Sequence, residues 1–220
     1  MNSSSQASLY QPPFSHLPHV STRSFIKRTI DVLGALVGLG LLSLLWMPIA
    51  IAIRLDSSGP IFYSQKRFGL QGKPFRIWKF RSMVSNADEL KVTILNEAQG
   101  LIFKNTQDPR ITRIGQFLRK TSLDEFPQFW NVLIGDMSLV GTRPPTEDEV
   151  QHYTERHWRR LDVRPGLTGQ WQVSGRSEIK DFEEIVDLDL HYQRHWTPLY
   201  DLKLLVQTVA TVFSKQSGAC

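Results

Sequence analysis

The hydrophobic and polar positions divide the chain into three parts. Residues 1–23 are rich in Ser, Gln, Pro and His and show no apolar period, which predicts a flexible leader. Residues 24–56 are strongly apolar, and no charged side chain occurs over the 22 residues from Val32 to Ile53. Residues 57–220 mix short apolar and polar runs, as a globular domain does. We therefore expect a leader, a membrane segment and one globular domain.

The apolar segment is long enough to cross a bilayer as a helix. Positive charges flank it on both sides, so the positive-inside rule assigns it no direction. Pro48 removes a helical hydrogen bond and predicts a kink just past the middle of the run. We expect a re-entrant helix-break-helix with both ends on one side of the membrane, and a straight transmembrane helix is the alternative. A signal peptide is disfavoured, because the run is too long and Arg54 directly follows the cleavage-like Ala50-Ile51-Ala52.

The remaining pattern predicts a compact, mostly helical domain with a small β-hairpin, which is an α+β fold. Strands are expected on either side of a turn at Gly69–Gly72, at Ile61–Tyr63 and around the basic stretch Lys79–Met83. Helices are expected over residues 86–97, 111–120, 146–160, 182–192 and 197–213. The last helix opens with an N-cap and a proline, Thr197-Pro198, and its apolar stripe suits either the core or the membrane interface.

Composition narrows the class of partner. The chain has 220 residues, a formal charge of +5 and a single cysteine, Cys220. The basic balance favours an anionic partner, which could be a phosphorylated substrate, an acidic lipid or a nucleic acid. A single cysteine excludes a disulfide within the chain and is compatible with a reducing compartment.

The stretch Thr121–Pro145 carries the candidate chemistry. It contains an adjacent acid pair, Asp124-Glu125, followed by a helix-like apolar run and a Gly-Thr-Arg-Pro-Pro loop. Ser122 and Glu125 fit an S-x-x-E capping box, or else Asp124 is itself the cap, with Pro127 in the first turn. Either version places two carboxylates at a helix N-terminus, which also attracts phosphate. On spacing alone, a capping role without catalysis is the favoured interpretation of the two acids, because the S-x-x-E motif is common.

Four motifs taken together resemble one family. They are Gly72-Lys73-Pro74-Phe75, Lys79-Phe80-Arg81-Ser82-Met83, the stretch Thr121–Pro145 and the glycine-rich run Arg164–Arg176. With them, the chain from Phe25 to Val212 resembles the bacterial sugar transferase family of monotopic polyprenyl-phosphate phosphoglycosyl transferases. The resemblance implies transfer of a sugar-1-phosphate from a UDP-sugar to polyprenyl (undecaprenyl) phosphate, with release of UMP, to initiate polysaccharide or glycoconjugate assembly. It implies a monotopic protein on the cytoplasmic face of a bacterial inner membrane, with residues 57–220 as the cytoplasmic catalytic domain. Its partners would be membrane lipids and these two substrates, and no nucleic acid.

The resemblance also implies roles for individual residues. Asp124 would attack the sugar-bearing phosphorus and form a covalent phosphosugar-aspartate, while Glu125 would position or deprotonate the lipid phosphate. Mg²⁺ or Mn²⁺ held by Asp124 would neutralise charge on the donor diphosphate. Phosphate and substrate binding is expected from basic residues of the matched motifs: Arg119, Arg143, Arg176, Lys79 and Arg81. Many family members have Pro where this chain has Thr142, which predicts a less rigid loop around Arg143.

Other classes of function remain open. A non-catalytic membrane-surface protein that binds anionic lipid would explain the basic balance and the apolar segment, but it leaves the acid pair without a function. A conventional glycosyltransferase would release UDP, and a metal-dependent phosphatase would release inorganic phosphate. The segment Trp171–Ser177 is more similar to family members that act on glucose or galactose than to those that act on acetamido sugars. Polyprenol length, pathway and oligomeric state, including a homo-oligomer, are not determined by the sequence.

Overall fold

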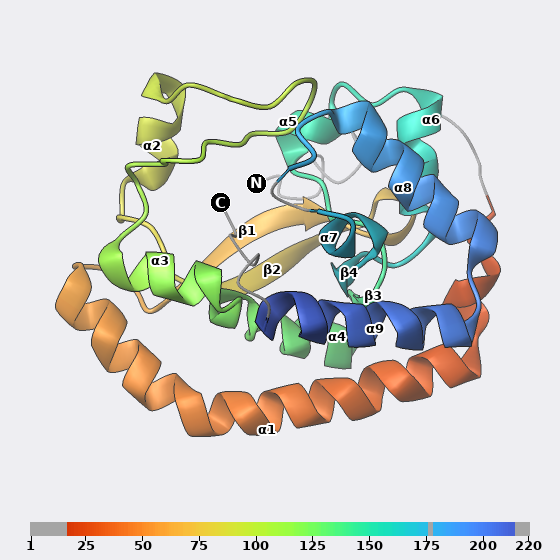
Figure 1. Ribbon diagram of the computed structural model, residues 1–220, viewed down its shortest axis with the longest axis horizontal. Coiled ribbons are helices and arrows are strands. Elements are labelled where there is room, and N and C mark those ends of the chain that lie inside the picture. Colours follow the sequence, from red (N-terminus) through yellow and green to blue (C-terminus); the bar gives the residue numbers. More distant parts are fainter. Residues whose placement is uncertain (1–16, 176–177, 214–220) are drawn as a thin grey trace, which may run out of the picture.

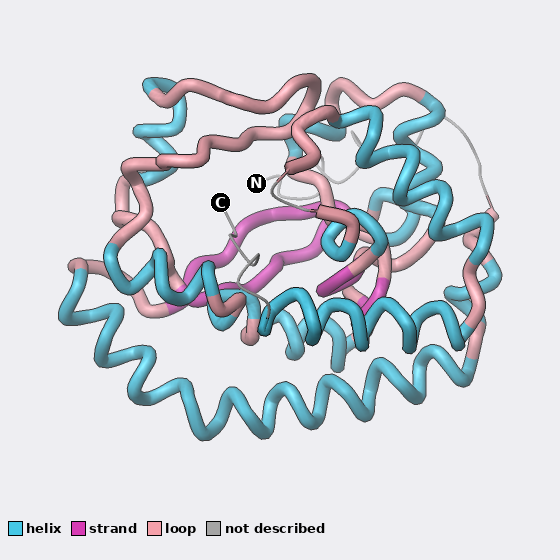
Figure 2. The backbone as a smooth tube through the Cα atoms, in the orientation of Figure 1, coloured by secondary structure: helices cyan, strands magenta, loops and turns pink. Residues whose placement is uncertain are grey.

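The computed structural model describes residues 17–175 and 178–213, and its fold is mixed α+β and mostly helical (Figures 1 and 2). The helices are α1 (Phe25–Asp56), α2 (Ala87–Leu90), α3 (Arg113–Lys120), α4 (Gln128–Ile134), α5 (Glu147–Val150), α6 (Glu155–Trp158), α7 (Gln170–Val173), α8 (Phe182–His195) and α9 (Pro198–Phe213). Short 3-10 turns are η1 (Val20–Arg23), η2 (Leu70–Gly72), η3 (Lys91–Thr93), η4 (Leu123–Glu125) and η5 (Arg159–Asp162). Two separate two-stranded sheets consist of β1 (Phe62–Phe68) with β2 (Pro74–Phe80), and β3 (Ser138–Val140) with β4 (Gly166–Thr168). The predicted α+β class is confirmed.

Helix α1 is long, apolar and bent. The Ser24 hydroxyl caps its N-terminus by accepting a hydrogen bond from the Lys27 amide. The helix continues through Pro48 as one element, and its C-terminal part turns back toward α3 (Figure 1). A proline inside a helix removes one hydrogen bond and favours such a bend. Within the described ranges, α1 is the one helix long and apolar enough to cross a membrane, and only 22% of its most apolar window is buried.

Two cations fix the N-terminal end of α1 to the rest of the fold. Lys27 is 6% exposed, and its ammonium donates to the Asp201 carboxylate of α9 at 2.7 Å. Arg28 donates to the carbonyls of Val132 and Leu133 in the last turn of α4, at 2.8 and 2.7 Å. These carbonyls lie at the negative end of the α4 dipole, where a guanidinium is stabilising.

The C-terminal end of α1 is bound to the same domain by different contacts. The Arg81 guanidinium donates to the carbonyl of Ser57, directly after the helix, at 2.6 Å. The Asp56 carboxylate accepts from the Ile114 amide in the first turn of α3 at 2.9 Å. Buried apolar side chains join the two parts in one cluster, namely Ile49, Ile53, Phe80 and Leu118. Both ends of α1 are therefore attached to one domain.

Strands β1 and β2 form an antiparallel hairpin, as predicted. The register pairs Phe62 with Phe80 and Phe68 with Pro74. Because directly paired residues share a face and faces alternate along a strand, one face carries Tyr63, Gln65, Arg67, Ile77 and Lys79. The outer edge of β2 is satisfied by Asn131 of α4, whose side chain accepts from the Trp78 amide and donates to the Arg76 carbonyl.

The parallel pair of β3 and β4 depends on a close approach of glycines. A Cβ added at Gly141 would lie 2.2 Å from the Arg164 carbonyl oxygen, and one at Gly166 would lie 2.1 Å from the Gly141 amide nitrogen. Only residues without a Cβ permit this spacing. The pair brings the loop after β3, which carries Arg143, against the chain that precedes β4.

Most helices predicted from spacing are confirmed, and two are corrected. The predicted cap of α9 is present, since the Thr197 hydroxyl accepts from the Tyr200 amide at 3.1 Å. The helix expected over residues 86–97 is limited to α2 and η3, because Val92 and Leu95 are 89% and 76% exposed and bury no apolar face that would extend it. The helix expected over residues 146–160 is divided into α5, α6 and η5, because Thr154 caps a new helix.

Candidate active site

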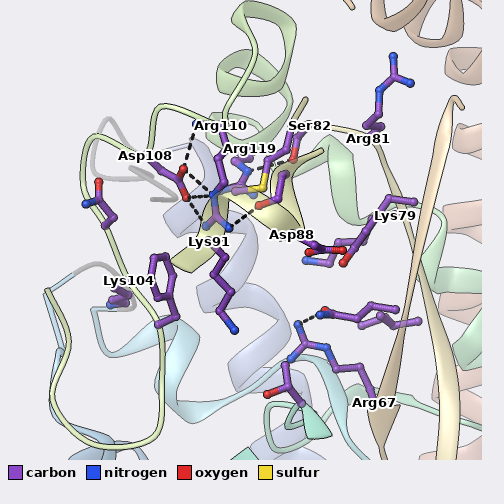
Figure 3. A pocket seen from close by; sticks show the side chains of 18 of the residues that line it. Arg67, Lys79, Arg81, Ser82, Asp88, Lys91, Lys104, Asp108, Arg110 and Arg119 are labelled. Atoms are coloured by element: carbon purple, nitrogen blue, oxygen red, sulfur yellow. Dashed lines mark hydrogen bonds and ion pairs between the residues drawn. The ribbon is translucent and has the colours of Figure 1, made fainter. Parts of the chain in front are cut away.

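A cavity of about 500 Å³ lies between the β1–β2 hairpin and the segment that follows α2. Figure 3 shows Arg67 and Lys79 on the hairpin side and Lys91 and Lys104 on the opposite wall. The side chains of Tyr63, Gln65, Arg67, Ile77 and Lys79, which share one face of the hairpin, all line it. A two-stranded sheet therefore supplies the floor of the cavity with side chains at alternate positions.

Basic side chains outnumber acidic ones in the lining. The basic residues are Arg67, Lys79, Arg81, Lys91, Lys104, Arg110, Arg119 and Arg143, and the acidic residues are Asp88, Asp108, Asp148 and Glu149. Two of the acids are already engaged by arginines, with Asp108 2.7 Å from Arg110 and Glu149 2.8 Å from Arg143. A concave surface with excess positive charge attracts a polyanion, such as a diphosphate.

The acid pair Asp124 and Glu125 lies in the turn η4, between α3 and α4. Ser122 before it has a φ of 55° and a ψ of 16°, a left-handed conformation that is uncommon for a residue with a side chain. The Ser122 hydroxyl makes no cap hydrogen bond and α4 begins only at Gln128, so the predicted capping box is wrong. The Glu125 carboxylate instead lies 3.0 Å from the Lys79 ammonium. Glu125 therefore forms an ion pair with β2, which is distant in sequence, instead of a local helix cap.

The acid pair borders the cavity through Lys79. The Lys79 side chain lines the cavity and holds Glu125 at its edge, and the adjacent Asp124 is only 6% exposed. A carboxylate with so little water around it interacts strongly with any charge placed next to it. The turn therefore carries one buried carboxylate, Asp124, and one ion-paired carboxylate, Glu125. Lys79 connects it to the basic cavity, whose lining includes neither acid.

Arg119 reaches the cavity from the last turn of α3. Its guanidinium donates to the Ser82 hydroxyl at 3.0 Å. Gly115 allows α3 to come this close, because a Cβ there would lie 1.9 Å from the Ser82 carbonyl oxygen. The predicted phosphate ligand Arg119 is thus held at the cavity wall by a helix packed directly onto the chain after β2.

Arg143 enters the cavity wall from the loop after β3. Its Nη1 atom donates to both oxygens of Glu149, at 3.0 and 2.8 Å, and α5 positions Glu149 through the cap residue Thr146. Burial alone would raise the pKa of the Glu149 carboxyl, but the charge and hydrogen bonds of Arg143 hold that pKa below its ordinary value. The Thr142 hydroxyl is fully buried and donates to the Arg160 carbonyl at 2.9 Å, which anchors the loop where proline is absent.

The other predicted ligands, Lys79, Arg81 and Arg176, differ in placement. Lys79 and Arg81 both line the cavity, and in Figure 3 the end of the Arg81 side chain points away from the other labelled side chains. The contacts of Arg81 with Ser57 tie the guanidinium to the end of α1. Arg176 lies outside the described residues.

A divalent ion would find few protein ligands at this site. Among the described residues, no group of three or more His, Cys, Asp or Glu side chains could hold a metal. Mg²⁺ at sites that bind nucleotide phosphates typically takes only one or two carboxylates, and the remaining ligands are phosphate oxygens and water. Asp124 supplies one buried carboxylate in the turn that Lys79 joins to the basic cavity, and one carboxylate agrees with that donor set.

Several lining residues escaped the sequence analysis. Arg67 alternates with Tyr63 and Gln65 on β1, but only the strand register places it on the same face as Lys79. Lys104 and the segment around it have no periodic pattern that would place them near the hairpin. Arg110 lies between two predicted helices, yet it is 5% exposed and donates to both oxygens of Asp108.

Comparison with known proteins places the chain among sugar transferases. The family model described as "Bacterial sugar transferase" matches residues 22–215. The chain is 50% identical over 188 residues to "Galactosyl transferase CpsE" of Streptococcus agalactiae serotype III (strain NEM316), which covers 84% of this chain and 42% of that protein. It is 38% identical over 225 aligned positions to "UDP-glucose:undecaprenyl-phosphate glucose-1-phosphate transferase" of Escherichia coli (strain K12), covering 99% and 46%.

A third relative has a similar length. "Exopolysaccharide production protein ExoY" of Sinorhizobium fredii (strain NBRC 101917 / NGR234) is 39% identical over 192 residues, which are 84% of each chain. By contrast, this chain spans less than half the length of the first two relatives. The similarity to those two proteins therefore concerns one portion of each.

Proposed function

The chain belongs to the bacterial sugar transferase family, and we propose that it transfers a sugar-1-phosphate from a UDP-sugar to undecaprenyl phosphate and releases UMP. The names of the relatives support this substrate class, and two of them refer to galactosyl and glucose-1-phosphate transfer. The product would start a polysaccharide or a related glycoconjugate, in line with the exopolysaccharide relative. A hexose is the proposed sugar.

The observation that carries this proposal is the position of the acid pair beside the basic cavity. Lys79 contributes both to the cavity lining and to the ion pair with Glu125. A nucleotide diphosphate in the cavity would bring its phosphorus atoms toward Asp124, and the surrounding cations would reduce the repulsion between two anions. A membrane-surface protein without activity would need the cations but not the buried carboxylate.

We propose a reaction in two displacements. A carboxylate oxygen of Asp124 bonds to the sugar-bearing phosphorus, and the bond from that phosphorus to the bridging oxygen breaks, so UMP leaves with that oxygen and its electron pair. A phosphate oxygen of undecaprenyl phosphate then bonds to the same phosphorus, and the Asp124 carboxylate leaves. Glu125 positions the lipid phosphate or accepts its proton. Arg119 and Arg143, with Arg176, bind the phosphates.

The proposed cofactor is Mg²⁺, which Mn²⁺ could replace. Asp124 is the protein ligand, and substrate phosphates supply the other charged ligands. When bound, the ion would neutralise negative charge on the donor diphosphate. The fit rests on the nature of the donors, namely one buried carboxylate next to a cavity with excess positive charge.

The re-entrant arrangement of α1 is likewise a proposal, and the attachment of both helix ends supports it. Lys27 binds α9 and Arg28 binds α4 at one end, while Arg81 and Asp56 join the other end to the same domain. A helix that crossed the bilayer could not keep both ends on one domain. The middle of α1 exposes apolar side chains that suit lipid: Leu33, Leu36, Val37, Leu41, Leu44, Trp46 and Met47.

Helix α9 is proposed to lie at the membrane interface. Its outer side exposes Leu199, Leu202, Val206 and Val209, while Asp201 and Leu204 are buried. Such a helix covers the core on one side and can enter the headgroup region on the other. The catalytic domain would then lie on the cytoplasmic face of a bacterial inner membrane, where a soluble nucleotide sugar and a lipid phosphate can meet.

The nucleotide product tests the proposed function. Full-length protein in nanodiscs with Mg²⁺ and undecaprenyl phosphate is supplied with a panel of UDP-sugars, and UMP, UDP and inorganic phosphate are quantified. We expect UMP from at least one hexose donor, with loss of this activity in Asp124→Asn and on chelation of the metal. Release of UDP would indicate a conventional glycosyltransferase, and release of phosphate would indicate a phosphatase. Absence of every product from all donors would contradict the proposal.

Chemical labelling tests the membrane arrangement separately. In a Cys220→Ser background, cysteines introduced at Ser8 and at Ser85 precede and follow α1. We expect an impermeant maleimide to reach both from the cytoplasmic side and neither from the other side. Labelling of the two positions from opposite sides would show that α1 crosses the membrane.

A further inference from the structure

Arg67 occupies an unusual electrostatic position in the cavity wall. It lies on β1, on the face of the hairpin that forms the cavity floor. Its guanidinium donates to the Pro144 carbonyl at 3.0 Å and to the Gln65 side-chain oxygen at 2.7 Å. Its Nε atom is buried and has no hydrogen-bond partner. Within the described part of the chain, both bonds of this arginine thus go to neutral oxygens, and no carboxylate forms an ion pair with it.

The nearest acid in the wall, Glu149, is committed to another cation. Both of its oxygens accept from Arg143, at 3.0 and 2.8 Å. Glu149 therefore forms its ion pair with Arg143 and not with Arg67. Burial and the positive charge of Arg143 lower the pKa of Arg67 to about 10, although the charges of Glu149 and Glu125 act in the opposite direction.

A partly buried cation without a counterion destabilises a folded protein unless something neutralises it. A counterion can approach Arg67 from the cavity, because Arg67, Arg143 and Glu149 all line it. Arginine also has the donor geometry that matches phosphate oxygens. Figure 3 shows Arg67 and Lys79 on the same side of the cavity, that of the hairpin.

We propose that Arg67 binds a phosphate group of a substrate, which supplies the counterion that the cavity wall lacks. The inference rests on the proposed function, whose two substrates both carry phosphate. The diphosphate of the nucleotide donor and the headgroup of the lipid acceptor share this chemistry. The Arg67 contact with the Pro144 carbonyl also joins the phosphate to the loop that carries Arg143.

Two substitutions test the proposal from opposite directions. Arg67→Gln removes the charge and the fork of donors. Gln65→Glu keeps the size of the side chain and its hydrogen bond, but it gives Arg67 a permanent carboxylate partner at the site of the present 2.7 Å contact. Arg76→Gln is the matched control, since Arg76 is an exposed arginine of the same hairpin on the opposite face.

The measurements use full-length protein in nanodiscs. They are the dissociation constants of UDP and of uridine, the KM for undecaprenyl phosphate, and the thermal midpoint without ligand. If Arg67 binds the donor, Arg67→Gln raises the Kd of UDP about tenfold or more and leaves that of uridine unchanged, because uridine has no phosphate. If Arg67 binds the acceptor, the KM for undecaprenyl phosphate rises instead. Gln65→Glu should raise the thermal midpoint and weaken the same phosphate ligand, and Arg76→Gln should change neither.

Different failures have different meanings. Equal losses of UDP and uridine binding in Arg67→Gln, or a stabilised Gln65→Glu protein with unchanged affinity for both phosphate substrates, would overturn the role of Arg67 in phosphate binding and leave a structural role. The proposed function would stand in either case, provided that the unsubstituted protein releases UMP. If the unsubstituted protein neither binds UDP nor releases UMP, the proposed function itself fails, and the inference fails with it.

Discussion

The Lys79 ammonium lies 3.0 Å from the Glu125 carboxylate, and this contact joins a strand of the hairpin to the turn that carries the acid pair. The two side chains are 26% and 17% exposed, so water screens their attraction only in part. The same lysine lines the cavity. A residue that lines the cavity thus sets the position of a residue of the acid pair.

A double-mutant cycle should detect this coupling. We expect Lys79→Gln and Glu125→Gln each to lower kcat/KM for UMP release by about a hundredfold, since both disturb the group proposed to act on the lipid phosphate. The double variant should lose little more than either single variant, because residues that act as a unit are not additive. Losses that multiply would show that the two side chains act independently.

The ion pair between Arg143 and Glu149 predicts a pH dependence of stability. The pKa of Glu149 is held below its ordinary value of 4.5, so the folded state binds this proton less tightly than the unfolded state. The resulting stabilisation is present above pH 4.5 and is lost as the pH falls through the lower, folded-state pKa. Glu149→Gln should therefore be less stable at neutral pH and show a shallower decline on acidification. Thermal unfolding in nanodiscs between neutral and acidic pH measures both, and parallel curves for the two proteins would contradict the assignment.

The buried pair of Lys27 and Asp201 should contribute strongly to stability. Lys27→Met leaves the Asp201 carboxylate buried with only its neutral partners, Tyr192 and Trp196, and should cost about 3 kcal/mol or more. Adding Asp201→Asn should restore part of this loss, because an amide needs no counterion. Lys203→Met is the control, because Lys203 is exposed on α9, the helix that carries Asp201. It should have little effect on the free energy of unfolding. Denaturant unfolding in detergent gives the free energies, and equal costs for the two lysines would rule out the pair as an anchor of α1.

Gly115 and Gly40 provide a matched pair of glycine-to-alanine substitutions within helices. At Gly115 a Cβ would lie 1.9 Å from the Ser82 carbonyl oxygen, whereas at Gly40 nothing lies within 4 Å. Gly115→Ala should force α3 outward, cost about 1–3 kcal/mol and reduce UMP release, because Arg119 bonds to Ser82. Gly40→Ala should be neutral or stabilising, as alanine favours a helix. Similar thermal midpoints for the two variants would contradict the close packing of α3.

Local features of the sequence predicted local structure well. The hairpin turn, the helix α3 and the cap of α9 depend on residues within a few positions of one another. The capping box failed for the opposite reason, since the Glu125 carboxylate bonds to Lys79, 46 residues away, rather than to the backbone of its own turn. The left-handed conformation of Ser122 accompanies that long-range contact and leaves no trace in the residue pattern.

In the candidate site, too, some residues could be predicted from sequence motifs, whereas others depend on contacts between distant parts of the chain. Resemblance to a family identified Arg119 and Arg143, and both line the cavity. Arg81 was expected to bind phosphate because it lies in a matched basic motif, but the structure places it just after β2. Its bonds to Ser57 depend on where the end of α1 lies in three dimensions, which no residue pattern contains. Arg67 required the strand register, because only pairing opposite Phe75 places it on the same face as Lys79.

Arg81 also links the cavity to α1, the helix that is proposed to lie in the membrane. Its guanidinium holds the end of α1, and its backbone directly follows the strand that ends at Phe80. If α1 is embedded in one leaflet as proposed, any change in leaflet thickness that tilts or lifts the helix pulls on the strand that carries Lys79. The depth of α1 in the membrane and the shape of the cavity floor would then change together. The acyl-chain length of the membrane lipids would thereby affect the rate of the proposed reaction, without contact between lipid tails and substrate.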